Sequence, residues 1–312
     1  MVSVNGLSPQ EIGQLVTNAG IAKSHLSWSD LMVRSFLGGV FISLGALVDL
    51  IIISGSPGLR TSNPSLATMI AGFTFPLGFV LVTLTNMELC TSNMFVMPYT
   101  TLQRRTTLYD LGRNWVMSYL FNIIGCLFVA GFLGWWSAVL STDVQTTYAV
   151  TQANARVNVG WSVNLLRGVG CNFLVALAFF MSLGSVEFVS KVFTIWIPVW
   201  SFVIAGYQHS IANYFSIPMG MFYGGAEFSV GRFIYQSIIP VTLGNIIGGA
   251  LLGSVPFWFL YGRGPVVNIQ TGQPLGEPKS EKGTESSDET AGDGGPASMN
   301  GSHRRYNRDG IV

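Results

Sequence analysis

The chain contains little charge. Of its 312 residues, 10% are Asp, Glu, Lys or Arg and 49% are hydrophobic, whereas about 25% of the residues in soluble domains are charged. The deficit is uneven, since 13 of the 31 charged residues follow Tyr261. This composition excludes a soluble globular protein and predicts a polytopic membrane protein with a polar tail.

Cysteine and histidine are also scarce, with three of each. Cys90, Cys126 and Cys171 lie in apolar stretches, which argues against a disulfide framework, and no CxxC spacing indicates a metal site. HExxH, Walker and GxGxxG motifs are absent from the sequence. We therefore expect no enzyme activity, no metal and no cofactor. The net charge of +1 gives no reason to expect a nucleic-acid partner.

Long apolar runs are abundant. Crossing a bilayer takes about 20 apolar residues, and such runs lie near residues 34–54, 66–100, 115–140, 161–185, 193–222 and 236–261. The second and fifth are too long and too interrupted to be single straight helices. The sequence therefore predicts an all-α membrane protein with six transmembrane helices.

Polar segments flank this membrane region. Within residues 1–30, Ser8-Pro9-Gln10-Glu11 is typical of a helix start, and an amphipathic pattern follows it. Residues 262–312 are rich in Gly, Ser, Glu and Pro, and we expect them to be a disordered tail. The predicted organisation is an N-terminal amphipathic helix within 1–30, a transmembrane domain over 31–261 and a tail over 262–312.

Basic residues in short loops indicate the orientation. Arg104, Arg105 and Arg113 lie between the second and third crossings, Lys191 between the fourth and fifth, and Arg263 after the sixth. Loops rich in Lys and Arg stay on the cytoplasmic side. We therefore expect both termini in the cytoplasm.

Two short patterns occur twice in the same order. Asn93-Met-Phe-Val-Met-Pro98 matches Asn213-Tyr-Phe-Ser-Ile-Pro218, and Asn122-Ile-Ile-Gly125 matches Asn245-Ile-Ile-Gly248. They indicate that residues 31–140 and 161–261 are copies. Because each copy has three crossings, the second copy is inverted, an arrangement common in transporters.

The predicted interruptions, Thr85 to Asn93 and Gly206 to Asn213, fall at matching places. Non-helical backbone at this depth is tolerated where it lines a cavity or is buried in protein. Half-helices that restart near Asn93 and Asn213 would point their positive N-terminal ends toward the middle of the membrane. Such ends favour an anion.

Ionisable residues inside a membrane are functional candidates. His209 lies in the second interruption, where it either donates a proton or hydrogen bond to a substrate or ties the loop to a carbonyl. Thr91, at the matching place, either binds a substrate oxygen or caps a half-helix. Glu88 is interpreted as an acceptor of backbone N–H groups. Asn172 either binds His209 or substrate, or joins helices, and Arg156 either attracts anions or has little effect.

Four long motifs resemble the formate/nitrite transporter family over residues 7 to about 261. They are Glu88-Leu-x-Thr91-Ser92-Asn93, Gly168-x-x-Cys171-Asn172-Phe-Leu-Val175, Gly206-x-x-His209-Ser-Ile-Ala-Asn213 and Pro240-Val-Thr-x-Gly-Asn245-Ile-Ile-Gly-Gly249. The resemblance implies an aquaporin-like protomer in a homopentamer, with one pore per subunit for nitrite, formate or hydrosulfide.

The resemblance also implies roles for particular residues. His209 and Thr91 would be the central pore pair, Asn172 and Asn213 pore asparagines, and Arg156 a vestibule residue. Glu88, Asn93 and Asn245 would structure the loops, while Phe75, Phe79, Val175 and Phe202 would form apolar constrictions. Packing is the alternative role for these four.

The sequence departs from the family pattern at Asn86-Met87, where small residues are usual, at Cys90, where a larger side chain is common, and at Ala176, usually cysteine. The long polar tail most resembles the fungal nitrite transporters. We therefore expect proton-linked nitrite uptake in nitrate assimilation at the plasma membrane, in which His209 shares a proton with the anion. The alternatives are a formate or general anion channel, an aquaporin-type neutral-solute channel and, most remotely, a membrane-embedded enzyme.

Overall fold

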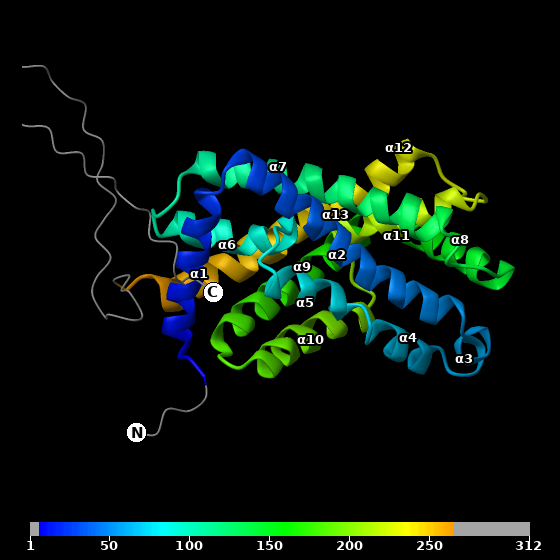
Figure 1. Ribbon diagram of the computed structural model, residues 1–312, viewed down its shortest axis with the longest axis horizontal. Coiled ribbons are helices and arrows are strands. Elements are labelled where there is room, and N and C mark those ends of the chain that lie inside the picture. Colours follow the sequence, from blue (N-terminus) through cyan, green and yellow to red (C-terminus); the bar gives the residue numbers. More distant parts are fainter. Residues whose placement is uncertain (1–5, 265–312) are drawn as a thin grey trace, which may run out of the picture. The chain divides into compact units, whose positions relative to one another are not determined.

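The computed structural model describes residues 6–264, and all regular structure within that range is helical (Figure 1). Five helical runs are long and apolar enough to span a membrane: α2 (Trp28–Ser54), α4–α5 (Pro64–Leu84), α7–η1 (Leu108–Trp136), α9 (Trp161–Gly184) and α12–η4 (Val230–Gly262). A shorter apolar helix, α10, covers Phe188–Ile204. The prediction of an all-α protein with several membrane-spanning helices is confirmed.

The remaining boundaries complete the element order. They are α1 (Pro9–Ser24), α3 (Pro57–Ser62), α4 (Pro64–Gly72), α5 (Pro76–Leu84), α6 (Cys90–Leu102), α7 (Leu108–Phe128), η1 (Val129–Trp136), α8 (Asp143–Val157), α11 (Ser210–Phe222), α12 (Val230–Phe233), η2 (Ile234–Ile238), α13 (Ile239–Ile246), η3 (Ile247–Ser254), α14 (Val255–Phe257) and η4 (Trp258–Gly262). The four η segments are π-helical turns.

Helix α1 begins as predicted. Ser8 caps it with a capping box, in which the Ser8 N–H donates to the Glu11 carboxylate at 2.7 Å and the Glu11 N–H donates to the Ser8 hydroxyl at 3.3 Å. Val16 is fully buried, and α1 packs against α6 and α9. Most of the predicted tail, from residue 265 onward, lies outside the described residues.

The short helix α3 and the longer helix α8 were not predicted. The sequence of α8, DVQTTYAVTQANARV, is polar and contains no long apolar run. The available signals were the Thr142–Gln145 capping box and the small residues Ala149 and Ala153, which lie one turn apart and are buried. The structure packs α8 against α11, so the segment between the two predicted copies is not a simple linker.

The long helices pack closely through glycines. A Cβ atom on Gly125 of α7 would lie 2.2 Å from the Phe36 carbonyl oxygen of α2, and one on Gly39 would lie 2.1 Å from the Asn122 carbonyl oxygen. The α9–α13 pair repeats this, since a Cβ atom on Gly244 would lie 2.1 Å from the Leu165 carbonyl oxygen. Small residues at such crossings let helix backbones approach in a membrane.

Gly125→Ala is therefore expected to destabilise the protein by about 1–3 kcal/mol, because the added methyl group meets backbone atoms that cannot move independently. The measurement is the thermal unfolding midpoint of purified protein in detergent. Gly112→Ala is the matched control on α7, since nothing lies within 4 Å of its Cβ position. Equal midpoints for the two variants would contradict the close-packing argument.

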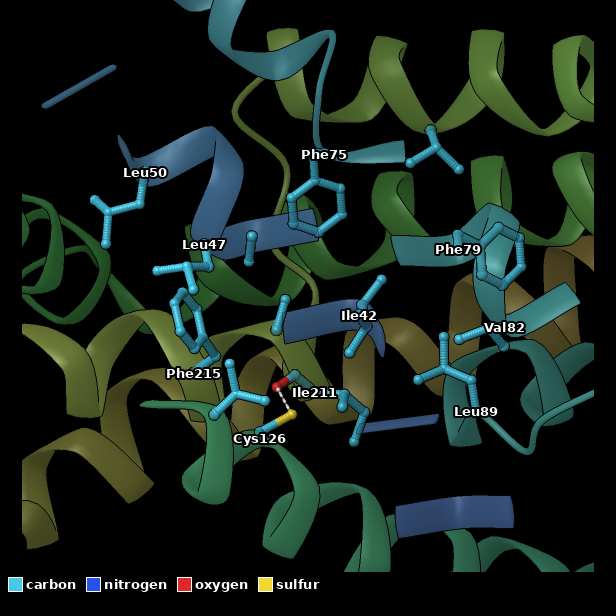
Figure 2. Packing of buried hydrophobic residues seen from close by; sticks show 14 of the residues in the cluster. Ile42, Leu47, Leu50, Phe75, Phe79, Val82, Leu89, Cys126, Ile211 and Phe215 are labelled. Atoms are coloured by element: carbon cyan, nitrogen blue, oxygen red, sulfur yellow. Dashed lines mark hydrogen bonds between the residues drawn. The ribbon is translucent and has the colours of Figure 1, made fainter. Parts of the chain in front are cut away.

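The apolar core includes side chains of α2, α5, α7 and α11, together with residues of α4, α6, α9 and α10. Figure 2 shows Ile42 and Leu47 of α2 packed among Phe79 of α5 and Ile211 and Phe215 of α11. The Cys126 thiol of α7 donates to the Ile211 carbonyl at 3.4 Å within this cluster (Figure 2). This core supports the two interrupted helices at their breaks.

Candidate functional site

The helix breaks have the same backbone form. Helix α5 ends at Leu84 and α6 begins at Cys90, while α10 ends at Ile204 and α11 begins at Ser210. Each break contains a left-handed residue, Asn86 (φ 55°) or Gly206 (φ 69°). Asn and Gly adopt this conformation most readily, which accounts for Asn86 where the family pattern has a small residue. The helices restart three residues before the predicted Asn93 and Asn213, each after an extended N-cap residue, Leu89 or His209.

Two asparagines hold the breaks in place. The Asn122 side-chain oxygen accepts from the Cys90 N–H at 2.8 Å, and its NH₂ group donates to the Ser35 carbonyl and, at 2.9 Å, to the Glu88 carbonyl. Asn245 does the same for the second break: it accepts from the Ser210 N–H at 2.9 Å and donates to two carbonyl oxygens, those of Gly168 at 2.8 Å and Gln208 at 3.1 Å. Each asparagine thus bonds two backbone groups at a break and ties them to a carbonyl of a neighbouring long helix, Ser35 of α2 or Gly168 of α9.

The breaks bring Thr91 and His209 together. The Thr91 hydroxyl lies 2.9 Å from His209 Nε2, and both residues are buried. His209 also caps α11, since its Nδ1 accepts from the Ala212 N–H at 3.0 Å. In a neutral ring with Nδ1 as acceptor, Nε2 carries the proton, so Nε2–H is the available donor. This tautomer follows from the hydrogen-bond network.

Beside each break, a cation contacts an acid or amide side chain. On the α6 side, Glu88 accepts from Lys23 Nζ at 2.6 Å, from Asn93 at 2.7 Å and from Asn114 at 3.2 Å. The interpretation of Glu88 as an acceptor of backbone N–H groups was wrong, because three side chains supply its hydrogen bonds. Lys23 of α1 reaches Glu88 over 65 residues of sequence, a contact that no local pattern signals.

On the α11 side, Gln208 occupies the corresponding place. Its side-chain oxygen accepts from Arg156 at 3.0 Å and from Asn213 at 3.1 Å, and Arg156 also donates to the Asn213 oxygen at 3.1 Å. Arg156 of α8 therefore corresponds to Lys23 of α1. Because Gln208 is neutral, Arg156 lacks the carboxylate partner that Lys23 has in Glu88.

His209 lines a cavity of about 210 Å³. Its lining combines one acid, two arginines and two glutamines with aromatic and small side chains: Asp49, Gln152, Arg156, Arg167, Gln208, His209, Phe75, Phe202, Tyr207, Ala46, Ala155, Val203, Gly206, Ala212 and Ser216. Sequence reasoning missed Asp49 and Gln208 as site residues. The signal for Asp49 was available, because it is the single acidic residue of the predicted crossing 34–54.

The four apolar candidates are buried. The rings of Phe75 and Phe202 meet edge-on with their centroids 5.7 Å apart. The Phe202 ring also lies nearly parallel to the His209 ring, with 6.2 Å between the centroids. Both phenylalanines also line the cavity. Phe79 and Val175 belong to the same buried cluster but do not line the cavity. The structure thus gathers Phe75 and Phe202 beside His209.

Asn172 does not bond His209 directly. Its NH₂ group donates to the Thr91 carbonyl at 3.0 Å and to the Asn245 carbonyl at 2.7 Å, so it connects the two breaks through backbone. Its buried side-chain oxygen has no partner among the described residues. Asn213, by contrast, uses both of its polar atoms on protein groups.

Comparisons with known proteins agree with this geometry. A probable formate transporter of Methanothermobacter thermautotrophicus is 34% identical over 269 residues, covering 81% of this chain and 97% of that protein. The formate channel BtFdhC of Bacillus thuringiensis is 33% identical over 243 residues, covering 78% and 91%. A solved pentameric formate channel with formate bound has the same fold, with a TM-score of 0.66 and 24% identity over 76% of this chain and 98% of that chain.

These relatives are transporters and channels rather than enzymes, and their names refer to formate. The predicted place in the fungal nitrite branch therefore stays a prediction. Residues 10–259 match the formate/nitrite transporter family along most of the chain. The chain belongs to this family of multi-pass small-anion transporters.

Proposed function

We propose that the chain is a nitrite transporter in which each protomer contains a pore that passes between Thr91 and His209. The observation that carries this proposal is the buried 2.9 Å contact between the two residues, where two interrupted helices meet. The Nε2–H of His209 faces this point and is a donor suited to an anion's oxygen.

The pore residues act in sequence on the anion. Arg156 and the positive N-terminal ends of α6 and α11 attract the anion. The Nε2–H of His209 then binds it between two apolar constrictions, Phe75 with Phe202 and Phe79 with Val175. Moving a bare charge through such an apolar section is costly. A proton that travels with the anion removes this cost. Because His209 Nδ1 is engaged by the Ala212 N–H, the ring acts as a neutral donor in this arrangement.

Formate is the second candidate substrate. Its favouring observation is that the relatives reported above are named for formate transport. Nitrite and formate are both small, planar and singly charged, and each presents two oxygens to a donor. The nitrite proposal rests on the resemblance of the sequence to the fungal branch.

The wider architecture is proposed on the same basis. We expect six crossings arranged as two inverted copies, a homopentamer, a plasma-membrane location and both termini in the cytoplasm. The matched hydrogen bonds around Asn122 and Asn245 support the two copies. The fold shared with a solved pentameric channel supports the oligomer.

Uptake of labelled nitrite into proteoliposomes, with formate as competitor across a pH series, tests the function. Saturable uptake that strengthens at acid pH and resists formate is the expected result. Full competition by formate would replace the nitrite proposal with a general monovalent-anion pore. Water or neutral-solute flux without anion uptake would favour the neutral-solute channel.

His209→Ala is expected to lower nitrite uptake by about 10- to 100-fold, because a hydrogen bond to a charged group is lost. The variant also removes the α11 cap. His209→Asn is the matched control, since asparagine caps helices well and still carries an N–H donor. Uptake rates should rank wild type, Asn and Ala in descending order. A wild-type rate and pH dependence in His209→Ala would contradict the role of the ring.

A further inference from the structure

Asp49 is an acid at the mouth of an anion site. It lies near the end of α2 and lines the same cavity as His209. Within the described residues Asp49 makes no hydrogen bond and no ion pair, whereas Glu88 forms an ion pair with Lys23. Glu88, by contrast, is held by three side chains. Asp49 therefore faces the cavity without the partners that a structural acid has.

The groups around Asp49 are mostly cationic. Arg156 of α8 and Arg167 of α9 share the cavity with it, and Arg156 interacts with Asp49 electrostatically. Tyr148 of α8 also interacts with Asp49, and Arg60 of α3 stacks over the Tyr148 ring at 4.1 Å.

The rest of the surroundings adds little charge. Tyr207 and His209 line the cavity from the break between α10 and α11. Helices α4, α5 and η1, which also pack on α2, contain no charged or titratable residue. From the other helices packed on α2, Cys126 of α7 donates to the Gly39 and Ile211 carbonyls, and Tyr214 of α11 pairs with Tyr119.

We propose that Asp49 determines the pH range over which the cavity admits anions, by competing with the anion for Arg156 and Arg167 when it is ionised. This inference rests on the proposed anion transport. With Asp49 ionised, the two arginines leave one net positive charge in the cavity; protonation of Asp49 leaves two. A cleft of one sign of charge concentrates the opposite ion, so the protonated form binds the anion more tightly.

This role differs from that proposed for His209. The histidine contacts the anion at the centre of the protein and affects the maximum rate. Asp49 acts at the mouth through its charge, so it affects the anion concentration at which transport is half-maximal. A pH dependence of KM therefore belongs to Asp49, even where the maximum rate depends on His209.

Asp49→Asn in the full chain, assayed as initial nitrite uptake by proteoliposomes at pH 5 to 8, tests the proposal. KM at pH 8 is expected to be about three- to tenfold lower than in wild type. KM should then vary little between pH 5 and 8, and the maximum rate should be unchanged. Asp49→Glu is expected to restore the pH dependence. Asp30→Asn, an exposed acid on the same helix, is the control and is expected to behave as wild type.

The outcomes separate the two proposals. If wild type takes up neither nitrite nor formate, the proposed function fails. If wild type transports nitrite but Asp49→Asn keeps the wild-type KM and pH profile, the Asp49 proposal alone is wrong. A lower maximum rate with unchanged KM would also overturn it, since Asp49 would then act on the anion's passage rather than on its admission.

Discussion

Asn245→Ala is expected to be among the most damaging single substitutions in the chain. The side chain satisfies the Ser210 N–H and the Gly168 and Gln208 carbonyls, and it is fully buried. Each buried polar group left unpaired costs about 1–3 kcal/mol, so the loss is about 3 kcal/mol or more. A loss of this size is a large fraction of a typical protein's stability.

The thermal unfolding midpoint and the yield of monodisperse protein in detergent measure this effect. Asn158→Ala is the control, because Asn158 is exposed and its side chain makes no hydrogen bond among the described residues. Asn122→Ala should match Asn245→Ala, since Asn122 makes the equivalent three bonds. A midpoint for Asn245→Ala close to that of Asn158→Ala would show that the breaks do not depend on this side chain.

Lys23→Met is expected to cost about 3–5 kcal/mol, because it leaves the buried Glu88 carboxylate without its cation. Adding Glu88→Gln to Lys23→Met should recover most of the loss. Glutamine is neutral, and Gln208 already takes this place in the second break, where it also bonds an asparagine. The double variant is therefore expected to be more stable than Lys23→Met alone.

The readouts are the unfolding midpoint and the rate of proteolysis in the α1–α2 turn, which reports release of α1. Lys191→Met is the control, since the Lys191 side chain makes no hydrogen bond among the described residues. If the double variant were less stable than both single variants, the electrostatic account of the pair would be wrong, and its hydrogen-bond geometry would be the main contribution.

Much of this site was predictable from the sequence. Hydropathy found the long helices, and the repeated NxFxxP frame located both breaks. Thr91 and His209 lie two and four residues before the asparagine of this frame, so the repeat does not match them with each other as expected, but the structure brings them within 2.9 Å. Hydropathy and repeated motifs are local or periodic signals, so they can be recognised without knowledge of tertiary contacts.

The parts that sequence reasoning missed depend on distant contacts. In the sequence Lys23 is an ordinary residue of an amphipathic helix, and its contact with Glu88 forms only when α1 packs beside the first break. Helix α8 is polar and escaped the hydropathy search, although it carries Arg156 to Gln208 and Asn213. Asp49 matters because Arg156 and Arg167 face the same cavity. No spacing in the sequence predicts these contacts between distant residues.

The matched contacts around the two breaks bear on the history of the gene. Lys23 and Arg156 are 133 positions apart, as are Ser35 and Gly168, whereas Glu88 and Gln208 are 120 apart. On the proposed duplication, the earlier copy thus has 13 more residues between Ser35 and Glu88 than the later copy has between Gly168 and Gln208. This interval includes α3 (Pro57–Ser62), whereas α9 is followed by α10 after three residues. The length difference thus falls where the earlier copy has α3, which has no counterpart in the later copy, and the matched contacts extend the proposed copies to α1 and α8.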